Sequence, residues 1–331
     1  MPVIARCTYS APFWLPGGDA QTIGARLFSC IPNLPYTREQ LELADGDYIY
    51  VDRLYCSKRE DRPARKLAIL SHGLEGDSDR AYMRALAVVC VRRGWDVAAR
   101  NFRGCGGAMN RLPKLYHSGD VEDLDAVVRY AVSKGYGEIA LAGFSMGGNQ
   151  VLKYLGERAD DAPKEVTCGV AVSVPCDLTG CSAMLGRPRN RIYMEYFMRT
   201  LRGKIREKHA AFPALFDVTK LDAMKTFKEF DDAFTAPLNG FSDAEDYWTK
   251  ASCAPCLPKI TRPSLIINAR NDPFLSDACY PIRAAEENAA LCLMMPKTGG
   301  HVGFPTMFGK TVGWLENTVA DFLEKGVAWL A

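Results

Sequence analysis

Short apolar runs alternate along the chain with segments whose apolar residues recur at helical spacing. Apolar runs bounded by turn residues predict buried strands, and stripes with a period of about 3.6 residues predict amphipathic helices. The runs predict strands at 66–70, 95–99, 138–142, 169–174, 264–268 and 291–295. The stripes predict helices at 80–93, 120–134, 149–158 and 310–330. This order is typical of a mostly parallel sheet covered by helices.

The pattern changes between residues 176 and 257, where aromatic and basic residues mix at helical spacing without clear strands. We interpret 176–257 as a helical cap inserted into a single α/β domain that spans residues 1–331. Its basic residues are expected to form a solvated helix face, and a contact with lipid headgroups is the alternative. These basic residues are Arg202, Lys204, Arg206 and Lys208.

The charge balance argues against a broad electrostatic partner. The 331 residues include 41 Lys and Arg and 39 Asp and Glu, which leaves a net charge of +2. This total gives no long-range field for nucleic acid. The sequence also lacks an apolar run of about 20 residues and a secretory signal at its N-terminus. We therefore expect a cytoplasmic protein without a transmembrane segment, and the sequence does not indicate its oligomeric state.

The cysteines and histidines do not indicate a metal or redox centre. The 12 cysteines show no short regular spacing, and we expect free thiols in a reducing compartment. Cys253 and Cys256 have the spacing of half a zinc site, but no second pair or nearby histidine completes it. We expect neither a metal nor an organic cofactor.

Residues 143–147 read Gly-Phe-Ser-Met-Gly, which has the form G-x-S-x-G, and they lie between a predicted strand and a predicted helix. A serine hydroxyl is a weak nucleophile and must be held exposed beside a base. A sharp strand-to-helix turn exposes it, and glycines remove Cβ atoms that would collide there. We predict Ser145 as the nucleophile; a capping serine at a glycine-rich helix start is the alternative.

An acid and a histidine follow in the chain order that this turn requires. Asp272 comes just after the predicted strand 264–268, where its carboxylate can orient an imidazole. His301 follows the predicted strand 291–295 and is the candidate general base. A turn cap is the alternative for Asp272, with Asp277 as the rival acid, and a structural loop residue is the alternative for His301.

Ester hydrolysis also needs donors for the oxyanion that develops on the carbonyl oxygen. The backbone N–H groups of Leu74 and Met146 occupy the two expected places, after a strand end and directly after the nucleophile. His72 is then expected to be a scaffold residue that bonds to its own loop.

These motifs resemble the YheT-like group of α/β-hydrolases, which is similar to the plant embryogenesis-associated proteins, the yeast medium-chain ethyl ester synthases and the mammalian abhydrolase-domain lipases. The likeness runs over most of the chain. It rests on the segments 20–23, 71–76, 101–104, 116–119, 143–148, 229–231, 271–274 and 299–304. The resemblance implies an α/β-hydrolase fold with a mostly parallel eight-stranded sheet, flanking helices and an inserted helical cap. It also implies ester hydrolysis or acyl transfer, with Ser145, Asp272 and His301 at the triad positions.

The resulting hypothesis is a serine hydrolase that cleaves carboxylic esters with a short- to medium-chain acyl group through an acyl-enzyme. Its substrate is a small-molecule ester, with a lipid-derived ester as one option. An acyltransferase to an alcohol and a non-catalytic ligand-binding protein are the alternatives. Tyr193, Phe197 and Phe234 are candidates for an acyl pocket. His117 and Asp231 are expected to shape the pocket or to pack structurally.

Overall fold

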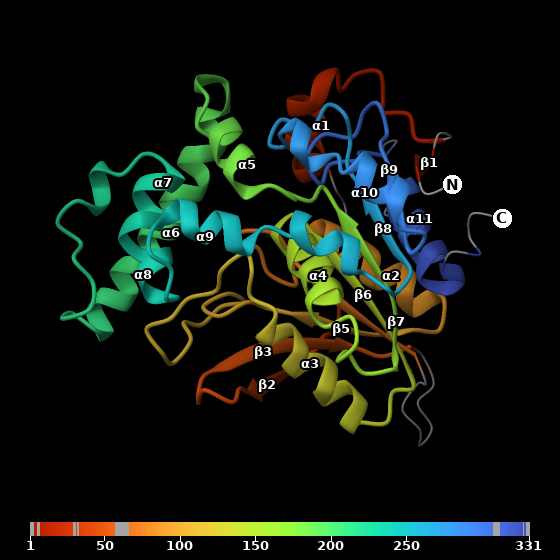
Figure 1. Ribbon diagram of the computed structural model, residues 1–331, viewed down its shortest axis with the longest axis horizontal. Helices are drawn as coiled ribbons and strands as arrows, with labels where there is room; N and C mark the ends of the chain where they lie inside the picture. The colour runs from red at the N-terminus through yellow and green to blue at the C-terminus, as the bar shows by residue number, and fades with distance from the viewer. Residues whose placement is uncertain are drawn as a thin grey trace.

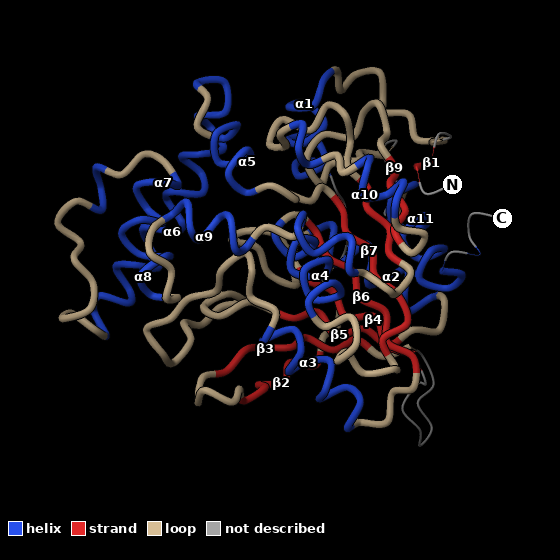
Figure 2. The backbone as a smooth tube through the Cα atoms, in the orientation of Figure 1, coloured by secondary structure: helices blue, strands red, loops and turns tan. Residues whose placement is uncertain are grey.

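A computed structural model describes residues 3–4, 7–28, 31, 33–56, 66–306, 312–326 and 328. In this part of the chain, nine strands form one sheet in the order β1-β9-β8-β7-β6-β4-β5-β3-β2 (Figures 1 and 2). The strands from β1 to β5 in this order run parallel, and β3 pairs antiparallel with both β5 and β2. The strands are β1 (Val3–Ile4), β2 (Thr37–Glu42), β3 (Tyr48–Leu54), β4 (Lys66–Ser71), β5 (Asp96–Arg100), β6 (Glu138–Phe144), β7 (Val166–Val172), β8 (Ser264–Ile267) and β9 (Leu291–Met294).

The mostly parallel sheet was expected, but with eight strands. The ninth is β1, whose two residues pair in parallel with Leu293 and Met294 at the edge of the sheet. So short a strand forms no recognisable apolar run. The apolar runs also gave no sign of β2 and β3. The first is largely polar, and the second carries charged residues, Asp52 and Arg53, that are buried in ion pairs.

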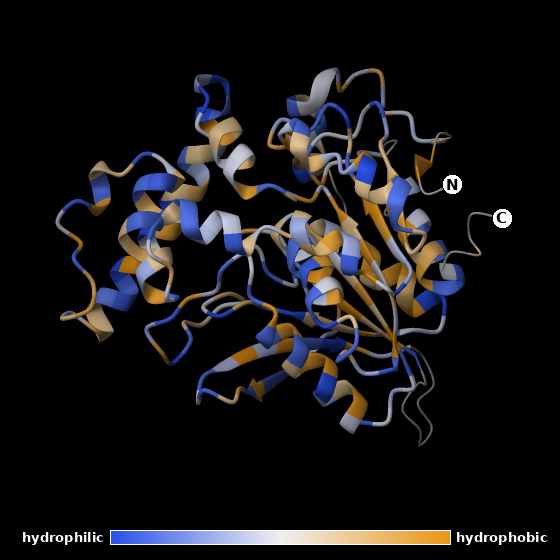
Figure 3. Cartoon of the chain, viewed as in Figure 1, coloured by the Kyte–Doolittle hydropathy of each residue, from blue (hydrophilic) through white to orange (hydrophobic). Residues whose placement is uncertain are grey.

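Helices cover both faces of the sheet (Figure 1). Apolar residues of α3 and α4 pack on one face, and those of α2 and α11 pack on the other. Figure 3 shows the apolar character of the central strands between these layers. The predicted helix at 310–330 corresponds to α11, although residues 310, 311, 327, 329 and 330 lie outside the described residues. These helices are α1 (Gly17–Phe28), α2 (Ala81–Arg92), α3 (Glu122–Ser133), α4 (Met146–Glu157), α10 (Ile282–Glu287) and α11 (Trp314–Lys325).

The connection between β7 and β8 carries a group of helices that lies beside the sheet. Figure 2 shows this group as helices joined by loops. The predicted insertion at 176–257 falls on these helices. They enclose an apolar core of their own, which includes Met198, Ile205 and Phe230. We call this group the α5–α9 segment: α5 (Leu178–Leu185), α6 (Arg191–Ala211), α7 (Phe227–Phe230), α8 (Ala236–Leu238) and α9 (Ala244–Ala251). Short 3-10 turns lie at Pro188–Asn190, Leu221–Ala223, Ala254–Lys259 and Asp277–Cys279, and a π-helical turn at Asp231–Thr235.

The basic stretch of α6 is not the solvated face that its spacing predicts. Lys208 is fully buried and donates a hydrogen bond to the carbonyl oxygen of Asn110 at 2.8 Å. Burial lowers the pKa of Lys208 from 10.5 to about 8. Lys204 is also largely enclosed, whereas Arg206 is exposed. Both lysines point inward because loops of the α/β domain supply oxygen acceptors there.

Candidate active site

Ser145 lies at the sharp turn between β6 and α4. Its φ of +52° and ψ of −119° form a conformation that is rare for residues other than glycine. The serine N–H donates to the carbonyl oxygen of Val172 at 2.8 Å, which fixes the turn to the neighbouring strand. A Cβ atom on Gly143 would lie 2.2 Å from the Gly147 oxygen, and one on Gly147 would lie 2.5 Å from the Ser71 oxygen. The two glycines are therefore needed for so close an approach.

The structure brings Ser145, His301 and Asp272 together from three distant parts of the chain. His301 Nε2 lies 3.0 Å from Ser145 Oγ. On the other side of the ring, Nδ1 lies 2.9 Å and 3.1 Å from the two carboxylate oxygens of Asp272. The Asp272 side chain is fully buried and that of His301 is 10% exposed. An anionic partner on Nδ1 places the ring proton there and leaves Nε2 as the acceptor that faces the serine hydroxyl.

Asp277, the rival acid, lies elsewhere. It is exposed and begins the 3-10 turn Asp277–Cys279, whereas the hydrogen bonds of His301 Nδ1 in the described chain go to Asp272. The Asp272 carboxylate also accepts the Phe274 N–H at 2.9 Å, which holds it in place.

Two residues near the N-terminus, neither of them predicted as a site residue, hold the loop at 299–304 that contains His301, here called the histidine loop. Thr22 Oγ1 accepts the His301 N–H at 2.8 Å. Gln21 Oε1 accepts the Gly299 N–H at 2.8 Å and an Asn271 amide N–H at 2.9 Å, so it joins the loops of both partners of Ser145. The only signal for them is that Gln21 and Thr22 belong to the segment 20–23 of the family resemblance.

The Leu74 and Met146 N–H groups, predicted as oxyanion donors, belong to the two segments that flank the nucleophile. Both residues line a cavity together with Ser145 and His301. Met146 is the first residue of α4, where backbone N–H groups have no intrahelical acceptor. The N–H groups on either side of Leu74 are engaged, because Gly73 donates to Tyr82 Oη at 3.0 Å and Glu75 donates to Tyr116 Oη at 3.2 Å.

The prediction that His72 is a scaffold residue is confirmed. Its Nδ1 lies 2.7 Å from the Gly73 oxygen, and its Nε2 accepts the Phe102 N–H at 3.1 Å. These partners require a neutral ring with the proton on Nδ1. Burial lowers the pKa of His72 from 6.5 to about 3, which keeps the ring neutral.

Glu75 joins the loop after β4, which also contains His72 and Leu74, to the α5–α9 segment. Its carboxylate accepts a hydrogen bond from Lys204 Nζ of α6 at 2.8 Å and another from Tyr116 Oη. Lys204 Nζ also lies 3.0 Å from Cys105 Sγ. Glu75 has a positive φ of +54°, so these contacts hold a strained residue directly beside Leu74.

Two cavities meet at Ser145 and His301. The inner one, of about 120 Å³, extends into the α5–α9 segment. The outer one, of about 410 Å³, runs between α1, α6 and the histidine loop. Of the predicted pocket residues, Phe234 lines the inner cavity, Tyr193 the outer and Phe197 both. The inner cavity is mostly apolar, with Leu115, Leu178, Leu185, Leu201, Phe227, Phe230 and Phe274 in its wall.

His117 and Asp231 both line the inner cavity. Asp231 Oδ2 accepts the indole N–H of Trp248 at 2.8 Å, and burial raises the carboxyl pKa to about 6. Burial lowers the pKa of His117 to about 3, so that its ring is neutral at pH 7. His117 packs edge-on against Phe241 and Tyr247. Of the two roles expected for them, shaping the pocket or packing structurally, both residues have the first, because they form part of the cavity wall.

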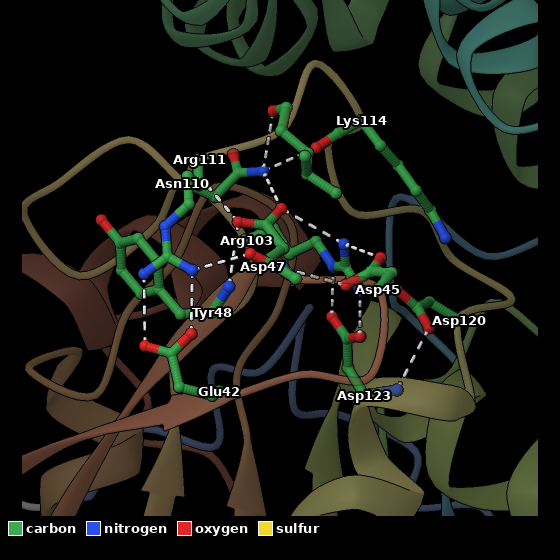
Figure 4. Close-up of polar contacts among 12 residues, drawn as sticks. Glu42, Asp45, Asp47, Tyr48, Arg103, Asn110, Arg111, Lys114, Asp120 and Asp123 are labelled. Carbon is green, nitrogen blue, oxygen red and sulfur yellow. Dashed lines mark hydrogen bonds and ion pairs between the residues drawn. The ribbon is translucent and has the colours of Figure 1, made fainter.

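A buried ionic cluster anchors the loop that carries Tyr116 and His117 (Figure 4). Arg103 forms two hydrogen bonds to the Asp123 carboxylate, at 2.7 Å and 2.8 Å. It also reaches Asp45 at 2.6 Å and Asp47 at 3.2 Å. Because Asp45 and Asp47 lie on the turn before β3, the cluster fixes the loop to the antiparallel side of the sheet.

The described cysteines are free thiols, and Cys30 lies outside the described residues. Cys253 and Cys256 are both buried. Within the described ranges, no group of three or more His, Cys, Asp or Glu side chains is arranged to hold a metal ion. In the same part of the chain, no helix is both long and apolar enough to cross a bilayer.

Comparison with known proteins shows the family to which the chain belongs. A family model described as "alpha/beta hydrolase fold" matches residues 68–306. The chain belongs to the α/β-hydrolase family. It is 33% identical over 311 residues to YheT of Escherichia coli (strain K12), a protein provisionally named an esterase, with 92% of this chain and 89% of YheT covered.

The chain is also similar to a curated mouse protein and, in fold, to a solved structure. The chain is 30% identical over 308 residues to phospholipase ABHD3 of Mus musculus, covering 92% of this chain and 74% of that protein. The solved structure of the Pyrococcus furiosus esterase Pf2001 superposes with a TM-score of 0.59 at 19% identity, covering 90% of this chain and 98% of that one. At that identity the superposition shows the shared fold.

Proposed function

We propose that the protein is a serine hydrolase that cleaves carboxylic esters through an acyl-enzyme. The observation that carries the proposal is the continuous array from Ser145 Oγ to His301 Nε2 and from His301 Nδ1 to Asp272, at 3.0 Å and 2.9 Å. Its geometry matches what a hydroxyl nucleophile, its base and the orienting carboxylate require. The esterase and phospholipase names of similar proteins support ester or lipid hydrolysis.

In the proposed reaction, Ser145 Oγ attacks the ester carbonyl carbon while His301 Nε2 accepts the hydroxyl proton. The N–H groups of Leu74 and Met146 stabilise the oxyanion, and His301 returns the proton to the leaving alcohol. Water, activated by the same imidazole, then attacks the acyl-enzyme and releases the carboxylic acid. Asp272 keeps the ring in the reactive tautomer and stabilises the imidazolium that forms twice in each cycle.

We propose that the ester occupies both cavities, with its carbonyl carbon beside Ser145. The inner cavity is apolar and of about 120 Å³, which suits a short- to medium-chain acyl group. We propose that the α5–α9 segment is a cap that supplies this acyl pocket. The outer cavity, of about 410 Å³, then receives the alcohol part of the ester.

The test combines covalent labelling with turnover. A fluorophosphonate probe should label Ser145, and hydrolysis of p-nitrophenyl esters should fall by several orders of magnitude in Ser145→Ala, because the members of a triad act as a unit. Ser182, which also lines the inner cavity, offers a control, since Ser182→Ala should keep both labelling and turnover. Undiminished turnover in Ser145→Ala would refute the proposal.

The same preparation distinguishes hydrolysis from acyl transfer and from simple binding. With excess ethanol present, a hydrolase releases mainly the free acid, whereas an acyltransferase releases mainly the ethyl ester. A binding protein would take up the ester without turnover.

A further inference from the structure

Most of the exposed large apolar side chains in the described chain gather at one place on the molecule. In the described chain seven are exposed, and five of them belong to α1, the residues before it and the first turn of α6. We call these five the apolar rim: Phe13 (89% exposed), Ile23 (41%), Leu27 (68%), Phe28 (55%) and Ile192 (75%). The remaining two, Leu215 and Ile282, lie outside this group. Exposed apolar side chains are ordinary when scattered, but a cluster marks a contact surface.

The apolar rim surrounds the outer cavity. Ile23, Leu27, Phe28 and Ile192 line it, together with Ser145 and His301 at its inner end. Phe13 packs edge-on against Trp14, which also lines the cavity. The cluster therefore lies where a substrate enters to reach the nucleophile.

The two elements that carry the rim are fixed to each other. Arg189, just before α6, forms an ion pair with Asp19 of α1 at 2.7 Å, and Tyr193 Oη donates to the same carboxylate at 3.1 Å. In Figure 1, α1 and the turn between α5 and α6 lie along the same edge of the molecule. The exposed side chains thus belong to one face, which these contacts hold together.

The charge of this face is positive. Arg26, Arg187 and Arg191 are exposed, and none of them has a carboxylate within 4.0 Å among the residues that the structure describes. Arg26 stacks on the ring of Tyr196, with its guanidinium carbon 4.7 Å from the centroid. Of the acidic groups nearby, Asp19 pairs with Arg189 and Glu195 pairs with Arg202. Glu316, in the wall of the outer cavity, accepts the Gly313 N–H at 2.8 Å.

We propose that this face docks on an anionic phospholipid surface, with the apolar rim inserted among the lipids and the three arginines at the headgroups. The proposal rests on the proposed function, since the covered face contains the entrance to the ester site. A protein seated on the rim would close that entrance, whereas a lipid surface can deliver an ester into it. Apolar side chains beside arginines that have no carboxylate partner in the described chain match the acyl-chain and headgroup zones of such a surface.

The experiment measures binding without turnover. Ser145→Ala is sedimented with vesicles of phosphatidylcholine containing phosphatidylglycerol, and with vesicles of phosphatidylcholine alone. We expect tighter binding to the anionic vesicles and weaker binding as salt is added. In the same background, Leu27→Ser/Phe28→Ser/Ile192→Ser should bind at least about tenfold more weakly. The matched control is Leu215→Ser/Ile282→Ser, which removes exposed apolar side chains elsewhere and should bind as its parent does.

Arg26→Gln/Arg191→Gln should lose the preference for anionic vesicles. Circular dichroism and the urea midpoint of each variant show that the variants fold. Equal binding by rim and control variants would overturn the proposal. The proposal would also be overturned if the protein formed a dimer through the apolar rim in solution and did not bind vesicles. Vesicle binding by a chain that hydrolyses no ester would instead refute the proposed function and leave the docking face in place.

Discussion

Replacing Lys204 by Met tests whether the contact between α6 and the Glu75 loop serves the reaction. The Lys204 and Glu75 side chains are only 14% and 4% exposed, and their charged atoms lie 2.8 Å apart. Met keeps most of the aliphatic stem and removes the charge. The Glu75 carboxylate then stays buried without its cation, a change that typically costs about 3–5 kcal/mol. Because Tyr116 Oη still donates to this carboxylate, we expect the lower end, about 3 kcal/mol.

The same substitution should affect turnover. Glu75 follows Leu74 directly and holds a strained φ of +54°, so losing its side-chain anchor lets the loop relax. An oxyanion donor that is removed costs about 10²–10³ in kcat, and one that is displaced should cost less, about tenfold. KM should change little, since the ester carbonyl meets this donor mainly in the transition state.

Urea unfolding followed by circular dichroism gives the free energy of unfolding, and p-nitrophenyl ester hydrolysis gives kcat and KM. Lys228→Met is the matched control, because Lys228 lies in the same segment but is 51% exposed. The control should change the free energy of unfolding by less than about 1 kcal/mol. In Lys204→Met/Glu75→Gln no buried charge is left alone, and stability should largely return. If Lys204→Met matched Lys228→Met in both stability and kcat, the positioning role of this pair would be refuted.

Three further predictions concern the site and its surroundings. Asp272→Asn should lower kcat by about 10³–10⁴ because an amide favours the wrong tautomer of His301, and a loss below tenfold in ester assays would contradict this. Thr22→Val removes the acceptor of the His301 N–H, a hydrogen bond that contributes about 1 kcal/mol. The loss should lower kcat several-fold and leave KM unchanged. An unaltered kcat would disprove the role of α1. Burial lowers the pKa of His72 and His117 from 6.5 to about 3, so the unfolded chain binds protons that the folded chain does not. The free energy of unfolding should therefore fall as the pH drops from 6.5 toward 3, by about 1.4 kcal/mol per pH unit for each histidine. Urea unfolding at a series of pH values should show that this free energy depends less steeply on pH in His117→Gln.

The sequence predicted the parts of the fold and site that leave a local pattern. Buried strands form apolar runs, and the turn around Ser145 needs glycines at fixed positions, so both can be recognised from short segments. Asp272 and His301 follow from chain order, because each comes after a strand whose carboxyl end lies at the same edge of the sheet as Ser145.

Other features depend on contacts that no short segment reveals. Gln21 and Thr22 act through hydrogen bonds to residues near the other end of the chain. Lys204 and Lys208 have the spacing of a solvated helix face, and only the neighbouring loops show that they are buried. The strand β1 exists because two residues fit against β9, a pairing that its own sequence does not specify.

The hydrogen bonds from Gln21 and Thr22 to the histidine loop span 278 and 279 residues. During synthesis the ribosome releases the turn around Ser145 long before the segment that contains His301. The segment near Gln21 can form these hydrogen bonds only after residues 299–301 have also emerged. A chain that lacks residues 299–301 would therefore display Ser145 without His301, the base of the proposed triad.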